Sequence, residues 1–257
     1  MSTSLLVMGC GELGLRVASR FVAAGGVAVG LTRTDLRHKE LVAHGVTARV
    51  SSEEVPSDHD ALLISAAGHA AQKGVLDRLR SGQAPRRSVL ISSTGYYGWT
   101  SGLVSEDTPA APDGHALALA AVEAEFRDWS GAGGVVLRLA GVYRLGRGPM
   151  SALQKSKSPP LGPPEKTLAL VHYDDAATAV LAALSAPAPE ATYLVVTPPC
   201  PTRRDFYHAA CVLLDLPTPA FDQDTGRPPT PFDTSRLRRD LLPIARHSRW
   251  QEALLHE

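Results

Sequence analysis

Three glycines near the start of the chain follow the spacing G-x-G-x-x-G, at Gly9, Gly11 and Gly14. A strand-like apolar run at 5–8 precedes them, and an amphipathic helical pattern at 13–22 follows. In this context the first glycine permits a tight turn, the second lets the backbone approach a ligand, and the third lets the helix pack on the strand. The N–H groups and dipole of such a helix attract an anion. The pattern predicts a loop that binds the pyrophosphate of a dinucleotide; a glycine turn without a ligand is the alternative.

The residues that end the second expected strand indicate which dinucleotide would bind. Residues 27–34 contain no acid that could hold a ribose 2′-hydroxyl, and they include Thr32, Arg33 and Thr34. Arg33 can pair with a 2′-phosphate, with Arg37 nearby, and such a charge-assisted hydrogen bond contributes about 1.5–3 kcal/mol. That free energy corresponds to a roughly 10- to 100-fold preference. We therefore expect NADP(H) to be preferred over NAD(H), with a solvated surface arginine as the alternative.

The elements that must position this loop alternate along the first part of the chain. The apolar runs are continuous, as is typical of strands covered on both faces. This alternation predicts an α/β fold, a doubly wound parallel-sheet Rossmann fold with a small C-terminal substrate-covering subdomain, in which residues 1–143 form the dinucleotide-binding core. The expected strands are 5–8, 27–31, 60–64, 88–91 and 134–139, and the expected helices are 13–22, 74–80 and 116–129.

The character of the sequence changes after residue 143. Residues 144–166 are rich in Gly, Pro, Arg and Lys and predict a long surface loop, and residues 217–232 are Pro-rich without a clear element. We expect 168–200 to return to the core, while 144–167 plus 201–257 form the substrate-covering subdomain. The elements expected here are a helix at 174–184, a strand at 193–196, a helix at 202–214 with Thr202 as N-cap, and short helices within 233–255.

Composition argues against several classes of function. The 257 residues contain 26 basic and 26 acidic side chains, which does not favour a nucleic-acid or anionic-membrane partner. Three cysteines form no disulfide framework, so we expect a reducing, cytoplasmic location. No apolar run approaches the ~20 residues of a membrane helix, and the early strand leaves no room for a signal peptide. We expect no metal site, since C-x-x-C and H-x-x-x-H spacings are absent, and no G-x-S-x-G nucleophile is present.

Five further segments occur in a consistent order after the glycine loop. They are SSTGYYG at 92–98, EDTP at 106–109, LRLAGVY at 137–143, VHYDD at 171–175 and TRRDFY at 202–207. With the glycine loop, they resemble the extended and atypical short-chain dehydrogenase/reductase superfamily, in particular the NAD(P)-dependent epimerase/dehydratase-like proteins of the YeeZ type. The resemblance covers nearly the whole chain. Asp174 and Asp175 could equally cap a helix, and Arg138 could only neutralise a neighbouring acid.

The glycine loop and the resemblance together assign candidate site residues. Ser93 takes the place of the active-site Ser/Thr of the superfamily, with Thr94 next to it. The candidate catalytic residues are Ser93, Thr94, His115 and Tyr97. The candidate cofactor-binding residues are Gly9, Gly11, Glu12, Leu13, Gly14, Thr32, Arg33, Ala66, Ala67 and Ser92.

The sequence departs from the superfamily where a Tyr and a Lys, four residues apart on one helix, would be expected. Residues 112–126 contain neither. Alignment on Glu123 places His115 at the Tyr position and Leu119 at the Lys position. His115 would titrate near neutrality and could act as the acid, although a solvated loop histidine is the alternative. Tyr96, Tyr97 and His172 are other donors, and the acidic pair of the dehydratases is replaced by Thr94 and Gly95.

Two functions remain open on this sequence. The first is an NADP(H)-dependent oxidoreductase or epimerase-like enzyme that lacks the Tyr-x-x-x-Lys pair and acts on a small or medium organic molecule. The second is a non-catalytic NADP(H)-binding redox sensor or scaffold protein, because atypical members of the superfamily keep the fold without the pair. The Ala-rich face of 116–129 would permit a homodimer, and a monomer is equally allowed.

Overall fold

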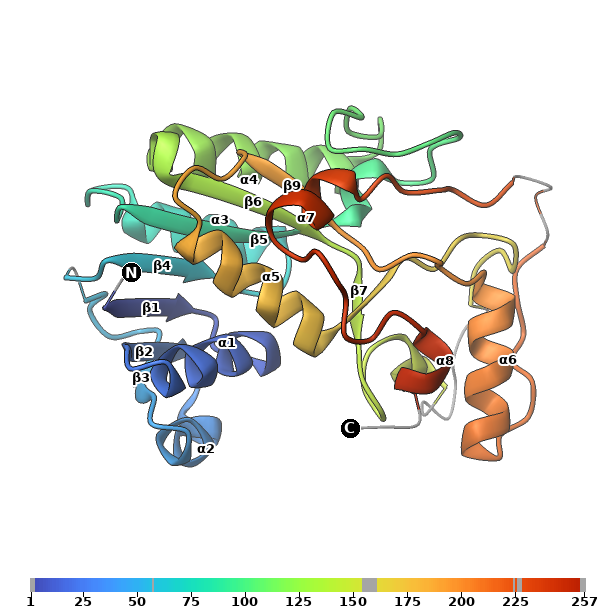
Figure 1. Cartoon of the computed structure of the whole chain (residues 1–257), viewed down its shortest axis with the longest axis horizontal. Coiled ribbons are helices and arrows are strands. Elements are labelled where there is room, and N and C mark those ends of the chain that lie inside the picture. The colour runs from blue at the N-terminus through green and yellow to red at the C-terminus, as the bar shows by residue number, and fades with distance from the viewer. Residues whose placement is uncertain (1–2, 57, 154–160, 224, 226–227, 255–257) are drawn as a thin grey trace.

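A computed structural model describes residues 3–56, 58–153, 161–223, 225 and 228–254. Its centre is a sheet of seven strands in the order β3-β2-β1-β4-β5-β6-β9, with every neighbouring pair parallel (Figure 1). The strand order reverses between β1 and β4, which is the place where open α/β sheets bind ligands. The strands are β1 (Ser4–Met8), β2 (Val27–Thr32), β3 (Thr47–Val50), β4 (Ala61–Ile64), β5 (Arg87–Ser93), β6 (Gly134–Leu139) and β9 (Thr192–Val195).

Helices cover both faces of this sheet, and each face has its own apolar core. One core joins the sheet to α1 (Glu12–Ala23) and α5 (Tyr173–Ser185), and Val17 and Ala176 lie in it. The other core joins the sheet to α3 (His69–Leu79) and α4 (Gly114–Ser130). The short helix α2 (His38–Ala43) lies between β2 and β3. Burial on both faces explains the continuous apolar runs of the central strands.

A smaller body of structure lies beside the carboxyl end of the sheet (Figure 1). It has its own apolar core, in which Tyr143, Phe206 and Trp250 are buried. The helix α6 begins with a capping box between Thr202 and Asp205, which satisfies free N–H groups of its first turn. Its elements are β7 (Gly141–Tyr143), β8 (Leu170–His172), α6 (Arg203–Leu214) and α8 (Trp250–Ala253), with β7 and β8 paired in parallel. The short helix α7 (Ser235–Asp240) packs instead on the central sheet at β9, and its Leu237 lies in the first core.

The predicted doubly wound parallel sheet is confirmed, and the differences lie at its margins. The strand β3 was not expected, because Thr47 and Arg49 make it polar and half-exposed at the sheet edge. The helix expected at 74–80 begins five residues earlier, at His69. Within the expected loop at 144–166, residues 149–152 form a 3₁₀ turn, and 154–160 lie outside the described residues. In the part of the chain described, no helix is long and apolar enough to cross a bilayer.

Candidate functional site

The glycine loop joins the end of β1 to the start of α1. Gly9 has φ +87°, and a Cβ there would lie 2.5 Å from the backbone nitrogen of Ala66. A Cβ on Gly14 would lie 2.9 Å from the Val7 side chain, so this glycine lets α1 pack on β1. A Cβ on Gly11 would meet only one atom at 4.0 Å. Space is therefore open at Gly11, where the first N–H groups of α1 have no intrahelical partner.

The first two residues of α1, Glu12 and Leu13, offer different groups to a ligand. Leu13 is buried in the core, so only its backbone can face a ligand. The Glu12 carboxylate lies 3.3 Å from guanidinium nitrogens of both Arg16 and Arg144. A carboxylate beside the anion site would repel a pyrophosphate, but these two cations offset its charge. The loop therefore combines open space at Gly11 with a neighbouring carboxylate whose charge is compensated, and the binding of a pyrophosphate there stays a prediction.

The end of β2 presents one exposed arginine. The Arg33 side chain is exposed, while Arg37 is held by two hydrogen bonds to Glu40, of 2.7 and 2.8 Å. Thr32 is nearly buried, and its hydroxyl donates to the Thr34 carbonyl at 2.8 Å. Of the groups expected near a 2′-phosphate, Arg33 is thus the cation whose guanidinium is not engaged by an acid within the described residues.

The remaining candidate cofactor residues follow β4 or end β5. Ala66 lies against Gly9, and its carbonyl accepts a hydrogen bond of 3.0 Å from Gln72. Ala67 is exposed next to it. Ser92 is buried and donates to Glu123 at 2.6 Å. This hydrogen bond gives Ser92 a structural role, and the cofactor role expected for it stays a prediction.

Ser93 and His115 come together at Gly95. Ser93 ends β5, and its Oγ accepts a 3.0 Å hydrogen bond from the N–H of Gly95, opening the 3₁₀ turn Thr94–Tyr97. A Cβ on Gly95 would lie 2.9 Å from His115 Nε2 and 3.3 Å from Ser93 Oγ. His115 is exposed on the first turn of α4. A hydroxyl and an imidazole thus share one small space beyond the carboxyl end of β5.

Tyr97 belongs instead to a buried polar network under this space. Its hydroxyl accepts a 2.8 Å hydrogen bond from Arg138, whose guanidinium also pairs with Glu123 at 2.8 Å. Burial raises the pKa of Tyr97 to about 12. That shift is opposite to the one a neighbouring lysine would produce, so Tyr97 is poorly suited to act as an acid or base. The guanidinium carbon of Arg138 also lies 3.4 Å from the ring centroid of Tyr96. Arg138 therefore holds both tyrosines of the 92–98 segment in place.

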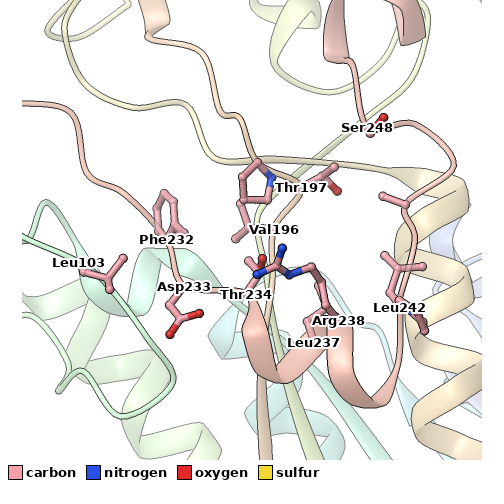
Figure 2. Close-up of a pocket in the computed structure, with 13 residues that line it drawn as sticks. Leu103, Val196, Thr197, Phe232, Asp233, Thr234, Leu237, Arg238, Leu242 and Ser248 are labelled. Atoms are coloured by element: carbon pink, nitrogen blue, oxygen red, sulfur yellow. The ribbon is translucent and has the colours of Figure 1, made fainter.

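Leu119, at the place of the superfamily lysine, is buried on α4. Two cavities lie beside the carboxyl end of the sheet, one at the end of β9 and one beside Gly95. One, of about 560 Å³, lies between the end of β9 and α7; Figure 2 shows Arg238 extending between Phe232 and Leu242. The other, of about 210 Å³, is lined by Thr94 and Gly95. Phe232 lines both cavities, so they lie next to each other.

Among the described residues, His172, Asp174 and His247 offer three potential metal-ligand atoms within 4.8 Å of one another. The Nδ1 of His172 accepts the backbone N–H of Asp174 at 3.2 Å, as N-cap of α5. The proton of the neutral ring is then on Nε2, which leaves no lone pair there for a metal. Burial and the stacked His247 ring lower the pKa of His172 to about 4. These contacts favour a structural role.

The aspartates at the start of α5 do not cap it with their side chains. Asp174 pairs with Arg16 at 2.8 Å and with Arg20, both on α1. Asp175 accepts the backbone N–H groups of residues 246 and 247, at 2.8 and 3.0 Å. The pair therefore fixes the C-terminal segment and α1 to the same helix end.

No protein-family model matches the sequence. YeeZ from Escherichia coli strain K12 is 34% identical over 161 residues, a segment that spans 60% of this chain and 56% of the YeeZ length. The chain thus matches little more than half of that relative.

Solved structures match nearly the whole chain. A conserved protein of unknown function from Silicibacter pomeroyi has a TM-score of 0.78 at 23% identity, covering 98% of this chain and 97% of its own. The UDP-glucuronic acid 4-epimerase from Bacillus cereus, in complex with NAD, has a TM-score of 0.75 at 16% identity, covering 99% and 97%. At these identities the matches establish the fold, and the expected resemblance is confirmed at that level.

Proposed function

Because this chain has the fold of NAD-dependent epimerase/dehydratase-like proteins and resembles YeeZ in sequence, we propose that it is an NADP(H)-dependent oxidoreductase or epimerase-like enzyme. Its substrate is a small or medium organic molecule with a carbonyl or hydroxyl group. The meeting of Ser93 and His115 at Gly95 is the observation on which the proposal rests. Both groups lie where open α/β sheets bind their ligands, beyond the carboxyl ends of the strands.

The glycine loop would hold the dinucleotide. Gly11 leaves open space at the start of α1, and the free N–H groups of that turn would receive the pyrophosphate. The exposed Arg33 would pair with a 2′-phosphate, which supports NADP(H) over NAD(H). When bound, the nicotinamide supplies or accepts the hydride. The bound dinucleotides of solved neighbours are described as NAD, so the NADP(H) preference rests on Arg33.

Ser93 and His115 would together handle the proton at the substrate oxygen, Ser93 as its donor and His115 as its exchanger with solvent. Ser93 Oγ already accepts the Gly95 N–H, so its own proton can be donated to the substrate oxygen. His115 is exposed and has Nε2 at the same place, so it can transfer a proton between that oxygen and solvent. This division replaces the Tyr and Lys absent from α4. Tyr97 is left out because Arg138 occupies its hydroxyl.

The proposal is tested by kinetics on variants of the two residues. Consumption of NADPH is followed on a panel of aldehydes and ketones with the wild type, Ser93→Ala, His115→Asn and the control His208→Asn, which alters an exposed histidine on α6. Loss of a positioned proton donor lowers turnover by about 10²-fold or more, while the affinity for NADPH stays unchanged. Full activity of Ser93→Ala and His115→Asn would refute these roles. NADPH binding without turnover on any panel member would favour the redox sensor instead.

A further inference from the structure

Among the described residues that line the smaller cavity beside Gly95, one is charged. Hydroxyl groups and small or apolar side chains make up the rest. Lys166 is that charged residue. The hydroxyl groups include those of Thr94, Thr100, Thr167 and Thr230. Since Gly95 is also the contact point of Ser93 and His115, a molecule held here would extend from the proposed reaction centre.

Lys166 is a half-buried cation without an acidic partner among the described residues. Its Nζ lies 5.6 Å from the ring centroid of Trp99. Burial and the nearby Arg203 hold its pKa below the ordinary lysine value, and Asp113 opposes them weakly. A partly desolvated ammonium without a counter-charge gains free energy when an anion arrives. The cavity therefore favours a negatively charged group.

The walls of the cavity are tied together before any ligand arrives. The Thr230 N–H donates to the Thr167 hydroxyl at 2.6 Å, and the Thr230 hydroxyl donates to the Thr100 carbonyl at 3.0 Å. Three segments far apart in the sequence are thus fixed to one another. The Thr167 hydroxyl, which accepts one hydrogen bond here, keeps its own proton for donation. Such preorganisation lowers the entropic cost of binding.

We propose that this cavity binds a carboxylate of the substrate, with Lys166 as the residue that determines specificity for it. One ammonium and neighbouring hydroxyl donors match a single negative charge, and a dianionic phosphate would leave charge uncompensated in about 210 Å³. The inference rests on the proposed function, which it deepens by naming the substrate class as carbonyl or hydroxyl compounds that bear a carboxylate.

The test compares two probes of nearly equal shape. Benzoate and benzamide are titrated by calorimetry into the full chain with saturating NADP⁺, using the wild type, Lys166→Met, Lys166→Arg and the control Lys39→Met, an exposed lysine on α2. We expect the wild type and Lys39→Met to bind benzoate at least about tenfold more tightly than benzamide, which is about 1.4 kcal/mol. Lys166→Met should abolish that preference, and Lys166→Arg should retain most of it.

Equal binding of the two probes, or a preference that survives Lys166→Met, would overturn the inference. Tighter binding of phenyl phosphate than of benzoate would overturn the choice of a carboxylate. A second readout uses lysine methyl signals after reductive ¹³C-dimethylation, which keeps the charge: benzoate should shift the Lys166 signal and not that of Lys39. Failure of the proposed function would be recognised separately, as absence of NADP⁺ binding or of turnover while the benzoate preference persists.

Discussion

Ser93 Oγ and His115 Nε2 both lie within 3.3 Å of the point where a Cβ on Gly95 would stand. Ser93 ends β5 and His115 lies in the first turn of α4, so two separate elements deliver the two groups. The glycine between them is what allows this approach. The superfamily resemblance placed His115 at the position of the missing tyrosine, and the structure brings it to the serine.

Substitution Gly95→Ala should impair turnover while leaving NADPH binding intact. The added Cβ would lie 2.9 Å from His115 Nε2, so the imidazole must move. Misplacement of a catalytic group by about 1 Å costs up to about 10²-fold. The measurement is kcat with a responsive carbonyl substrate, beside the NADPH dissociation constant. Gly82→Ala, whose Cβ would have an ordinary 3.6 Å contact, is the matched control. Unchanged kcat in Gly95→Ala would count against the pair.

Substitution Gly9→Ala should destabilise the fold as well as abolish dinucleotide binding. Its φ of +87° is unfavourable for alanine, and the Cβ would lie 2.5 Å from the Ala66 backbone. We expect a loss of more than about 2 kcal/mol, since left-handed strain alone costs about 1–2 kcal/mol. Urea unfolding measures it. Gly74→Ala inside α3 is the control: its Cβ meets nothing within 4 Å, and it should stabilise by about 0.5–1 kcal/mol. Similar midpoints for both variants would be incompatible with the loop geometry.

Substitution Glu123→Gln should be strongly destabilising. Glu123 is fully buried, pairs with Arg138 at 2.8 Å and accepts from Ser92. Removal of one partner leaves the buried guanidinium without a counter-charge, which costs about 3–5 kcal/mol. Glu125→Gln, two residues further along α4 and paired with Arg80 near the surface, should change the unfolding free energy by less than about 1 kcal/mol. Equal effects of the two would show that the buried pair is not a principal support of the site.

Stability should fall with acid between about pH 6.5 and about 4 because of His172. Its pKa is lowered in the folded protein, so the unfolded chain takes up the proton first as the pH falls. Burial is the main cause; His247, Arg16 and Arg246 add to it, and Asp174 opposes it. The loss is on the order of 2–3 kcal/mol below the folded-state pKa. In His172→Asn, whose amide oxygen can still cap α5, thermal unfolding should depend less on pH; an unchanged dependence would contradict this assignment.

The central fold could be predicted from sequence because its strands are buried on both faces. Residues 5–8 and 134–139 are continuous apolar runs, and they occupy the middle of the sheet. The edge strand β3 could not be recognised, since half-exposed positions at an edge accept polar residues such as Thr47 and Arg49. The strands β7 and β8 were not predicted, because each has only 3 residues and gives too short a pattern to recognise.

The candidate site was only partly foreseeable. The glycine spacing predicts the loop, but the closeness of Ser93 to His115 depends on a 3₁₀ turn that has no periodic signal. Ser92 was predicted to bind the cofactor; its hydroxyl donates to Glu123, a contact that the sequence did not indicate, and the cofactor role stays a prediction. Lys166 was missed because it lies in a segment that resembles a loop; its rarity, as one of five lysines in the chain, is the signal that could have drawn attention to it.

The proposed function requires that the glycine loop and Arg33 bind NADP(H). The most direct measurement is a fluorescence titration of the purified protein with NADPH, run in parallel with NADH and repeated on Arg33→Met. We expect NADPH to bind roughly 10- to 100-fold more tightly than NADH, and Arg33→Met to remove that difference. Equal binding of both dinucleotides by the wild type would eliminate the role of Arg33. Binding of neither would contradict the account as a whole.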